Sequence, residues 1–131
     1  MRLLLTGGAG YIGSHTALLL LQRGYDVIIY DSFVNSSYKV IKAIKSFLDS
    51  VEVDYKLKIV KGDIRDKSSL DKIFKDSIKE GNPIQSVIHF AGLKSVSESV
   101  KYPLKYWDVN VCGTENILEI MKDNECYSNF F

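Results

Sequence analysis

Three glycines near the amino terminus have the spacing of a phosphate-binding turn. Gly7, Gly10 and Gly13 follow a short apolar run and precede a helical pattern. A turn of this kind needs glycine where φ is positive, where the backbone approaches a pyrophosphate, and where the helix packs on the preceding strand. The N–H groups of Tyr11, Ile12 and Gly13 would then face phosphate oxygens at a helix N-terminus. The alternative is an ordinary strand-to-helix turn that is rich in glycine.

A carboxylate follows the next apolar run at a distance that suits a dinucleotide-binding fold. Asp31 comes 18 residues after Gly13 and directly after Val27–Tyr30. In such a fold it accepts hydrogen bonds from the adenosine ribose and repels the 2′-phosphate of NADP. Because no arginine follows immediately, the pattern favours NAD. The rival interpretation is that Asp31 or Ser32 caps the helix that follows.

Two later strand ends offer further candidate contacts. Asp63 follows Leu57–Val60, and either a bond to an adenine amino group or a structural turn would account for it. At the end of the next strand, Ala91 and Gly92 are small enough for a ribose or a nicotinamide to lie close. Lys94 after them is either a ligand for phosphate or hydroxyl groups or a surface charge.

The elements that must position these groups alternate between strands and helices. The expected strands are Leu3–Leu5, Val27–Tyr30, Leu57–Val60, Ser86–Phe90 and Ser128–Phe131. The expected helices run from Ile12 to about Arg23, from Ser36 to about Val51, through Leu70–Ile78 with Asp66 as N-cap, and onward from Pro103. The central strands lack polar alternation, which is typical of parallel strands covered on both faces. We therefore predict an α/β fold, a Rossmann-like doubly wound parallel sheet truncated at about its fifth strand, with residues 1–131 as one incomplete domain.

The helix that follows Pro103 is expected to be long. Its apolar residues at helical spacing should share one face: Val111, Thr114, Ile117, Leu118 and Met121. Asn110 lies on that face as a polar residue, so it needs a hydrogen-bond partner.

Composition and charge indicate a globular protein of about one domain. The chain has 131 residues and a net charge of +1, which argues against nucleic-acid or membrane-surface binding. No apolar run approaches the roughly 20 residues of a membrane-spanning helix, and no signal-peptide layout is seen, so a cytoplasmic location is expected. Cys112 and Cys126 are too isolated for a disulfide framework, and no metal site is expected. We interpret His15 and His89 as packing residues.

These motifs together resemble the extended short-chain dehydrogenase/reductase family. The stretch Thr6–His15 is similar to the opening signature of that family, and Val87–Lys94 is similar to its later loop, with further matches through Gly113 and Thr114. The Gly92-Leu93-Lys94 form of this loop resembles the UDP-glucose 4-epimerase branch. The departures concern the finer shape of the active-site loop, and they are Ser32, Ser95, Ser97 and Trp107.

The resemblance implies a set of NAD-binding residues, to which the glycine motif adds Gly13. It raises Lys94 and Asn110 from open alternatives to expected contacts. The implied residues are Gly7, Gly10, Tyr11, Ile12, Asp31, Ser32, Asn35, Ser36, Asp63, Ile64, Phe90, Ala91, Gly92, Lys94 and Asn110.

The resemblance also implies a hydride-transfer mechanism whose catalytic residues are not found in this chain. In the family a tyrosine acts as base on the sugar 4-hydroxyl, within a Tyr-x-x-x-Lys pair that follows a serine or threonine past strand five. The sequence reaches Phe131 just before that serine is expected. Tyr38 and Lys42 match the spacing, but they would lie at the adenosine end of the site, and chance accounts for one such match. We therefore assign no catalytic residue.

The leading hypothesis is the NAD-binding amino-terminal part of a UDP-glucose 4-epimerase-like enzyme, an isomerase. The complete enzyme would take a UDP-sugar substrate, and its oligomeric state is left open with a homodimer as the candidate, whereas this chain alone would be inactive. One alternative is another NAD-dependent nucleotide-sugar enzyme of the dehydratase type. A further alternative is a non-catalytic NAD-binding remnant, although an uncovered apolar sheet edge should make the isolated chain marginally stable or prone to aggregation.

Overall fold

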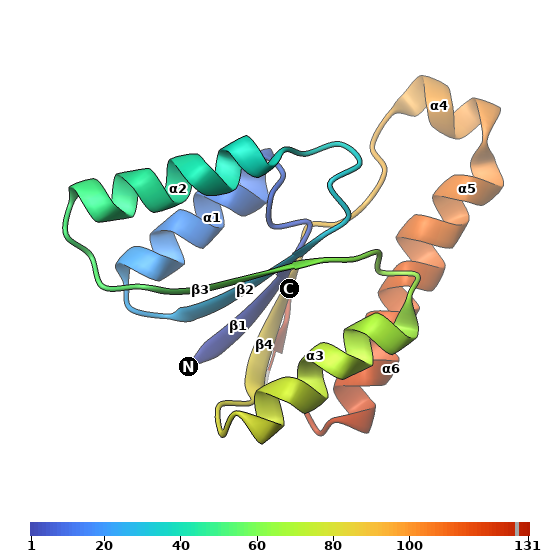
Figure 1. Ribbon diagram of the computed structural model, residues 1–131. Coiled ribbons are helices and arrows are strands. Elements are labelled where there is room, and N and C mark those ends of the chain that lie inside the picture. The colour runs from blue at the N-terminus through green and yellow to red at the C-terminus, as the bar shows by residue number, and fades with distance from the viewer. Residues whose placement is uncertain (128) are drawn as a thin grey trace.

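The computed structural model describes residues 1–127 and 129–131, and these form a five-stranded parallel sheet in the order β3-β2-β1-β4-β5 (Figure 1). The strands are β1 (Arg2–Thr6), β2 (Asp26–Asp31), β3 (Lys56–Lys61), β4 (Ile84–His89) and β5 (Asn129–Phe130). The order reverses direction between β1 and β4, as in a doubly wound sheet. The predicted fold class is confirmed, while Ser128 of the fifth expected strand lies outside the described residues.

The sheet is covered on both faces, which explains why the central strands β1 and β2 are buried along their whole length and apolar over most of it. On one face Leu3 and Leu5 of β1 pack against α1 (Tyr11–Gln22) and α2 (Tyr38–Ser50). On the other face Leu4 packs against α3 (Lys67–Lys79) and α6 (Gly113–Asp123). Successive residues of a strand point to opposite faces, so Leu3 and Leu5 meet one pair of helices and Leu4 meets the other.

The helix ends follow local hydrogen bonding. Asp66 accepts the N–H of Ser69 at 3.0 Å and caps α3, as predicted. The cap of α2 is Ser37, whose hydroxyl accepts the N–H of Lys39 at 3.2 Å. The helix therefore begins at Tyr38, two residues later than the predicted start at Ser36, and the Ser36 hydroxyl is held by another partner described below.

The segment after Pro103 differs from the single long helix predicted from sequence. A short helix, α4 (Val96–Lys101), precedes it, and the segment itself divides into α5 (Pro103–Trp107), the π-helical turn η1 (Asp108–Cys112) and α6. A π turn holds an extra residue, so it rotates the faces of the helices on its two sides relative to each other. Figure 1 shows α4 and α5 extending beyond the body of the sheet.

The buried face of this segment was also predicted incorrectly in part. Ile117 and Met121 are buried as expected, but Val111 and Leu118 are 42% and 46% exposed, and Ile120 is buried in their place. Both stripes have helical spacing, and packing against α3 selects one of them. Within the described residues, helices long and apolar enough to cross a membrane are absent.

Candidate functional site

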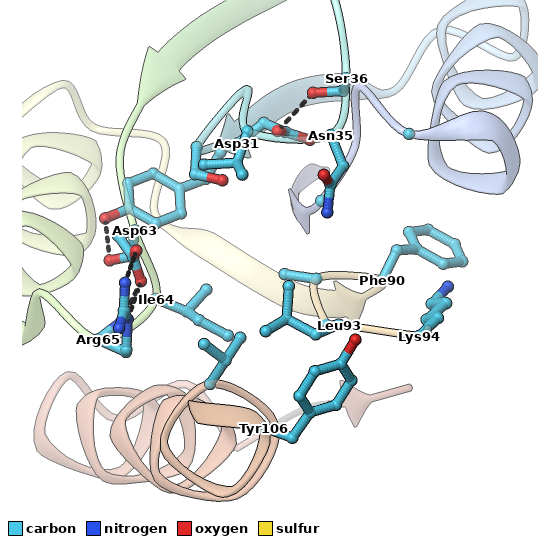
Figure 2. Close-up of a pocket in the computed structure, with 18 of the residues that line it drawn as sticks. Asp31, Asn35, Ser36, Asp63, Ile64, Arg65, Phe90, Leu93, Lys94 and Tyr106 are labelled. Atoms are coloured by element: carbon cyan, nitrogen blue, oxygen red, sulfur yellow. Dashed lines mark hydrogen bonds and ion pairs between the residues drawn. The ribbon is translucent and has the colours of Figure 1, made fainter. Parts of the chain in front are cut away.

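A cleft of about 730 Å³ lies at the carboxyl ends of the parallel strands, next to the reversal between β1 and β4. Ligands of open α/β sheets bind at this position. Figure 2 shows Asp31, Asn35 and Ser36 along one side of the cleft, with Leu93 and Tyr106 on the other. The predicted residues that line it are Gly7, Gly10, Asp31, Ser32, Asn35, Ser36, Asp63, Ile64, Phe90, Ala91, Gly92 and Lys94.

The glycine loop joins β1 to α1 at the centre of this cleft. Gly7 has a φ of +66°, and a Cβ there would lie 2.5 Å from the backbone nitrogen of Ala91. A Cβ on Gly13 would lie 2.6 Å from the carbonyl oxygen of Gly7, so α1 packs directly on the loop. Gly10 is the N-cap of α1 and donates its N–H to the Gly7 carbonyl at 3.0 Å. Larger side chains would push the loop away from β4.

The remaining predicted residues of the loop belong to the first turn of α1. Tyr11 and Ile12 occupy the first positions of α1, with exposed fractions of 83% and 57%. Gly13 is buried beneath the loop and lies outside the described lining of the cleft, as do Tyr11 and Ile12. The backbone N–H groups of a first helical turn have no intrahelical acceptor, so this end of α1 attracts anions.

Asp31 is a structural tie as well as a candidate ligand. Its Oδ2 accepts the N–H of Ala9 at 2.9 Å, and its Oδ1 accepts the N–H of Phe33 at 2.8 Å. The same Oδ1 accepts the hydroxyl of Ser36 at 2.8 Å (Figure 2). The residue is only 7% exposed. A carboxylate has about four acceptor positions, so about one is left for a ligand. The rival interpretation, that Asp31 or Ser32 caps the following helix, is wrong, because Ser37 caps α2 and Asp31 instead holds the loop that precedes it.

The loop after β2 contains a strained residue that the sequence did not reveal. Phe33 has a φ of +57°, a region that bulky residues rarely adopt. Its N–H is fixed by Asp31, and its ring stacks on Tyr38 with 3.9 Å between centroids. Tyr38, which matches the catalytic spacing by chance, is thus a packing partner of this loop. Strain of this kind persists where surrounding contacts hold the backbone.

Asp63 is paired with a cation that sequence analysis did not consider. Its Oδ2 accepts from Arg65 Nη2 at 2.7 Å, and its Oδ1 accepts from Arg65 Nε at 3.0 Å and from the Arg65 backbone N–H at 2.9 Å (Figure 2). Arg65 also donates to Asp108 of η1 at 3.0 Å. The Arg65 guanidinium lowers the pKa of the Asp63 carboxyl. Asp63 is therefore an ionised acceptor at neutral pH within a structural turn.

The loop between β4 and α4 forms another wall, and Asn110 holds it. The Oδ1 of Asn110 accepts the N–H of Leu93 at 2.8 Å, and its Nδ2 donates to the Leu93 carbonyl at 3.0 Å. A Cβ on Gly92 would lie 3.2 Å from the same Oδ1. Asn110 thus finds the partner that the sequence required, but it lies outside the described lining of the cleft. Lys94, by contrast, lines it.

A polar cluster in this wall was missed at the sequence level. Glu98 accepts from Lys105 Nζ at 2.8 Å and from the Tyr106 hydroxyl at 2.9 Å, and that hydroxyl accepts the N–H of Ser95 at 3.1 Å. Hydrogen bonds to the Glu98 carboxylate lower its pKa, and the bond from Lys105 has the largest effect. These residues lie on either side of Pro103, so no single periodicity connects them.

A second concave surface lies between α1 and α2, beside the cleft. It measures about 740 Å³ and is lined by side chains that include Tyr11, His15, Leu18, Val40 and Phe47. His15 is exposed and lies edge-on to Tyr11, with 5.0 Å between ring centroids. This surface is largely apolar, and its described lining has neither a carboxylate for ribose hydroxyls nor a lysine or arginine for phosphate, so the cleft suits a dinucleotide better.

The cleft has the features that a dinucleotide requires. It combines a glycine surface without Cβ atoms, a helix N-terminus, carboxylates at the ends of β2 and β3, and a cation at Lys94. Its volume lies within the range of about 300–1,000 Å³ that is usual for small-molecule and cofactor sites. The residues present therefore fit a bound dinucleotide.

Comparison with known proteins gives an independent result. The model of the GDP-mannose 4,6 dehydratase family matches residues 4–130. A UDP-glucose 4-epimerase of Klebsiella pneumoniae is 43% identical over 122 residues, which are 93% of this chain and 81% of that protein. The bifunctional protein gal10 of Schizosaccharomyces pombe is 46% identical over 122 residues, 93% of this chain but 16% of that protein.

Two solved structures share the fold over almost the whole chain. The UDP-glucose-4-epimerase of Stenotrophomonas maltophila, with bound NAD and formylated UDP-arabinopyranose, is 38% identical with a TM-score of 0.86. The UDP-glucose 4-epimerase of Bifidobacterium longum, in complex with NAD+ and UDP, is 37% identical with a TM-score of 0.87. Each match covers 99% of this chain and 36% of the other chain. This chain thus spans about a third of these two enzymes.

The energetic cost of the close approach between Gly7 and the backbone after β4 can be measured separately from the cost of the positive φ of Gly7. Gly24 also has a positive φ, +78°, but a Cβ there would meet nothing within 4 Å. We expect Gly24→Ala to lower the free energy of unfolding by about 1–2 kcal/mol, the usual cost of a left-handed residue. Gly7→Ala should lose a further ~1–3 kcal/mol because its methyl group meets backbone atoms. Urea denaturation measures both, and equal losses would contradict the close approach.

The Asp63–Arg65 pair should give an acid-dependent contribution to stability. Because the folded pKa of Asp63 is lowered, this contribution is complete above the unfolded carboxyl pKa, about 3.9, and is lost as pH falls through the folded value. The wild type should therefore exceed Asp63→Asn in Tm at pH 6, and the gap should narrow by pH 3. An exposed pair of this kind contributes about 0.2–1 kcal/mol. In an Arg65→Met background, the Tm difference caused by Asp63→Asn should no longer change between pH 6 and pH 3. If this Tm difference were independent of pH both with Arg65 and in the Arg65→Met background, the Asp63–Arg65 pairing would be ruled out.

Proposed function

The chain belongs to the UDP-glucose 4-epimerase and GDP-mannose 4,6-dehydratase type of the extended short-chain dehydrogenase/reductase family, and we propose that it binds NAD in the cleft. The observation that carries this proposal is the packing of Gly7 against Ala91, which leaves a surface without side chains at the start of α1. The NAD-bound relatives from S. maltophila and B. longum support it through their shared fold. In this proposal residues 1–131 form the NAD-binding domain.

The proposed contacts divide the cofactor between the strand ends. The amides of Tyr11 and Ile12 would bind the pyrophosphate at the start of α1, and Gly7, Gly10 and Gly13 would allow that approach. The free acceptor position of Asp31 would bind the adenosine ribose. The remaining contacts would come from the loops after β2, β3 and β4 and from η1: Ser32, Asn35, Ser36, Asp63, Ile64, Phe90, Ala91, Gly92, Lys94 and Asn110.

We further propose that the whole protein is a UDP-glucose 4-epimerase, which interconverts UDP-glucose and UDP-galactose. When bound, NAD would supply the acceptor for a hydride from the sugar. This chain's residues would bind and orient the cofactor, while the catalytic serine, tyrosine and lysine would come from outside residues 1–131, so the chain alone would be inactive. The dehydratase reaction is the second candidate, because the matching family model has that description.

An exposed apolar run supports a homodimer of the whole protein. Val96, Val100, Leu104 and Trp107 of α4 and α5 are 79%, 79%, 82% and 63% exposed. Exposed apolar groups that cluster in this way are typical of protein interfaces. A second copy of the protein would cover them.

NAD binding is directly measurable on this chain by isothermal titration calorimetry. We expect one NAD per chain, with NADP bound at least about tenfold more weakly because Asp31 repels its 2′-phosphate. The Gly7→Ala variant should lose binding, whereas Gly24→Ala, which leaves the loop unchanged, should keep it. Absence of NAD binding by the folded wild type would refute the proposed function.

The reaction can be tested in a chimera. This chain would replace the matched amino-terminal third of the B. longum enzyme, which supplies the rest. We expect the chimera to convert UDP-galactose to UDP-glucose and to be a dimer by light scattering, and Leu104→Glu with Trp107→Glu should make it monomeric. A 4-keto-6-deoxy sugar product would favour the dehydratase instead. NAD binding without either product would remove the epimerase assignment.

A further inference from the structure

His89 makes specific hydrogen bonds that the packing interpretation does not explain. It ends β4 beside Thr6 of β1, and its Nδ1 lies 2.5 Å from the Thr6 hydroxyl oxygen. Its Nε2 lies 3.0 Å from the hydroxyl oxygen of Thr114 on α6. The side chain is half-buried, and each ring nitrogen has a hydrogen-bond partner on a neighbouring element of the protein.

The partners of Thr114 assign the protonation of this ring. The Thr114 hydroxyl donates to the Asn110 carbonyl at 2.7 Å, and it has a single hydrogen. It must therefore accept from His89, which places the proton on Nε2. In the neutral ring Nδ1 is then an acceptor, and the Thr6 hydroxyl donates to it. Burial lowers the pKa of His89, consistent with the neutral form.

The same hydrogen bonds continue into the wall of the cleft. Asn110 belongs to the π-helical turn η1, and its backbone carbonyl is fixed by Thr114. Its side chain makes the two hydrogen bonds to Leu93 described above, and its Oδ1 lies beside Gly92. The chain of contacts therefore runs from the end of β1 through His89, Thr114 and Asn110 to the loop that carries Lys94.

We propose that His89 is a positioning residue: its Nε2–H form fixes Thr114 and Asn110, and through them the Gly92–Lys94 wall of the cleft. A side chain that only filled space would have no preferred tautomer and would not affect Leu93. The part of this proposal that concerns NAD rests on the proposed function. The part that concerns the hydrogen-bonded chain is independent of any ligand.

Nuclear magnetic resonance tests the hydrogen-bonded chain without a ligand. The nitrogen-15 shifts of the His89 ring should show the Nε2–H tautomer. In Thr114→Val, the Leu93 amide should exchange with solvent about five- to tenfold faster, because its acceptor Asn110 is no longer held. Thr16→Val is the matched control, since Thr16 makes the same bond to the carbonyl four residues before it, at 3.1 Å, on α1. In Thr16→Val, the Leu93 amide should exchange with solvent at the same rate as in the wild type.

Two amide substitutions of His89 separate positioning from packing. In His89→Gln the amide group reaches the position of Nε2 and can donate to Thr114, whereas in His89→Asn it reaches only the position of Nδ1. His89→Gln should therefore retain Leu93 protection and NAD affinity, and His89→Asn should lose about five- to tenfold in both. Thermal unfolding shows that each variant is folded at the temperature of measurement.

The possible outcomes are distinct. An Nδ1–H tautomer, or Leu93 exchange in Thr114→Val equal to that of the wild type, would overturn the positioning role. Equal losses in His89→Gln and His89→Asn would also overturn it, because packing would then explain both. If the wild type binds no NAD, the proposed function fails, and the tautomer and the Leu93 exchange still decide the role of His89.

Discussion

The contact between the glycine loop and the exit of β4 constrains the whole site. Gly7 lies so close to the Ala91 backbone that a single methyl group would separate the two loops. That approach places the start of α1, which attracts anions, directly beside the wall that carries Lys94. It also requires β1 and β4 to be neighbours, which is the reversal point of the strand order. The position of the cleft thus follows from one close backbone contact.

Hydrogen bonds and ion pairs then hold each loop around that contact. Asp31 connects the glycine loop to the loop after β2, Arg65 connects the loop after β3 to η1, and Asn110 connects η1 to the loop after β4. The strands beneath are held by apolar packing on both faces. The molecule therefore separates a core stabilised by burial from a site positioned by polar groups, which preorganises the walls for a ligand.

The sequence predicted the features that depend on local backbone geometry. Gly7 has the positive φ that is expected for the first glycine of this motif. The lack of polar alternation in the central strands correctly predicted a parallel sheet. The sequence could not predict features that depend on contacts distant in the chain. Arg65 was not recognised as the partner of Asp63 and Asp108, and no periodicity links Glu98 to Tyr106. The choice of Ile120 over Leu118 as a buried residue depends on the packing of α6 against α3, and the helical spacing gives no signal for the π turn at Asn110.

The most direct test of this account is a titration of the nitrogen-15-labelled chain with NAD, followed through its backbone amide resonances. If the cleft is the binding site, the largest shifts will be at the amides of Tyr11 and Ile12 and at those of Leu93 and Lys94. Shifts confined to the apolar surface between α1 and α2, around Leu18, Val40 and Phe47, would contradict it.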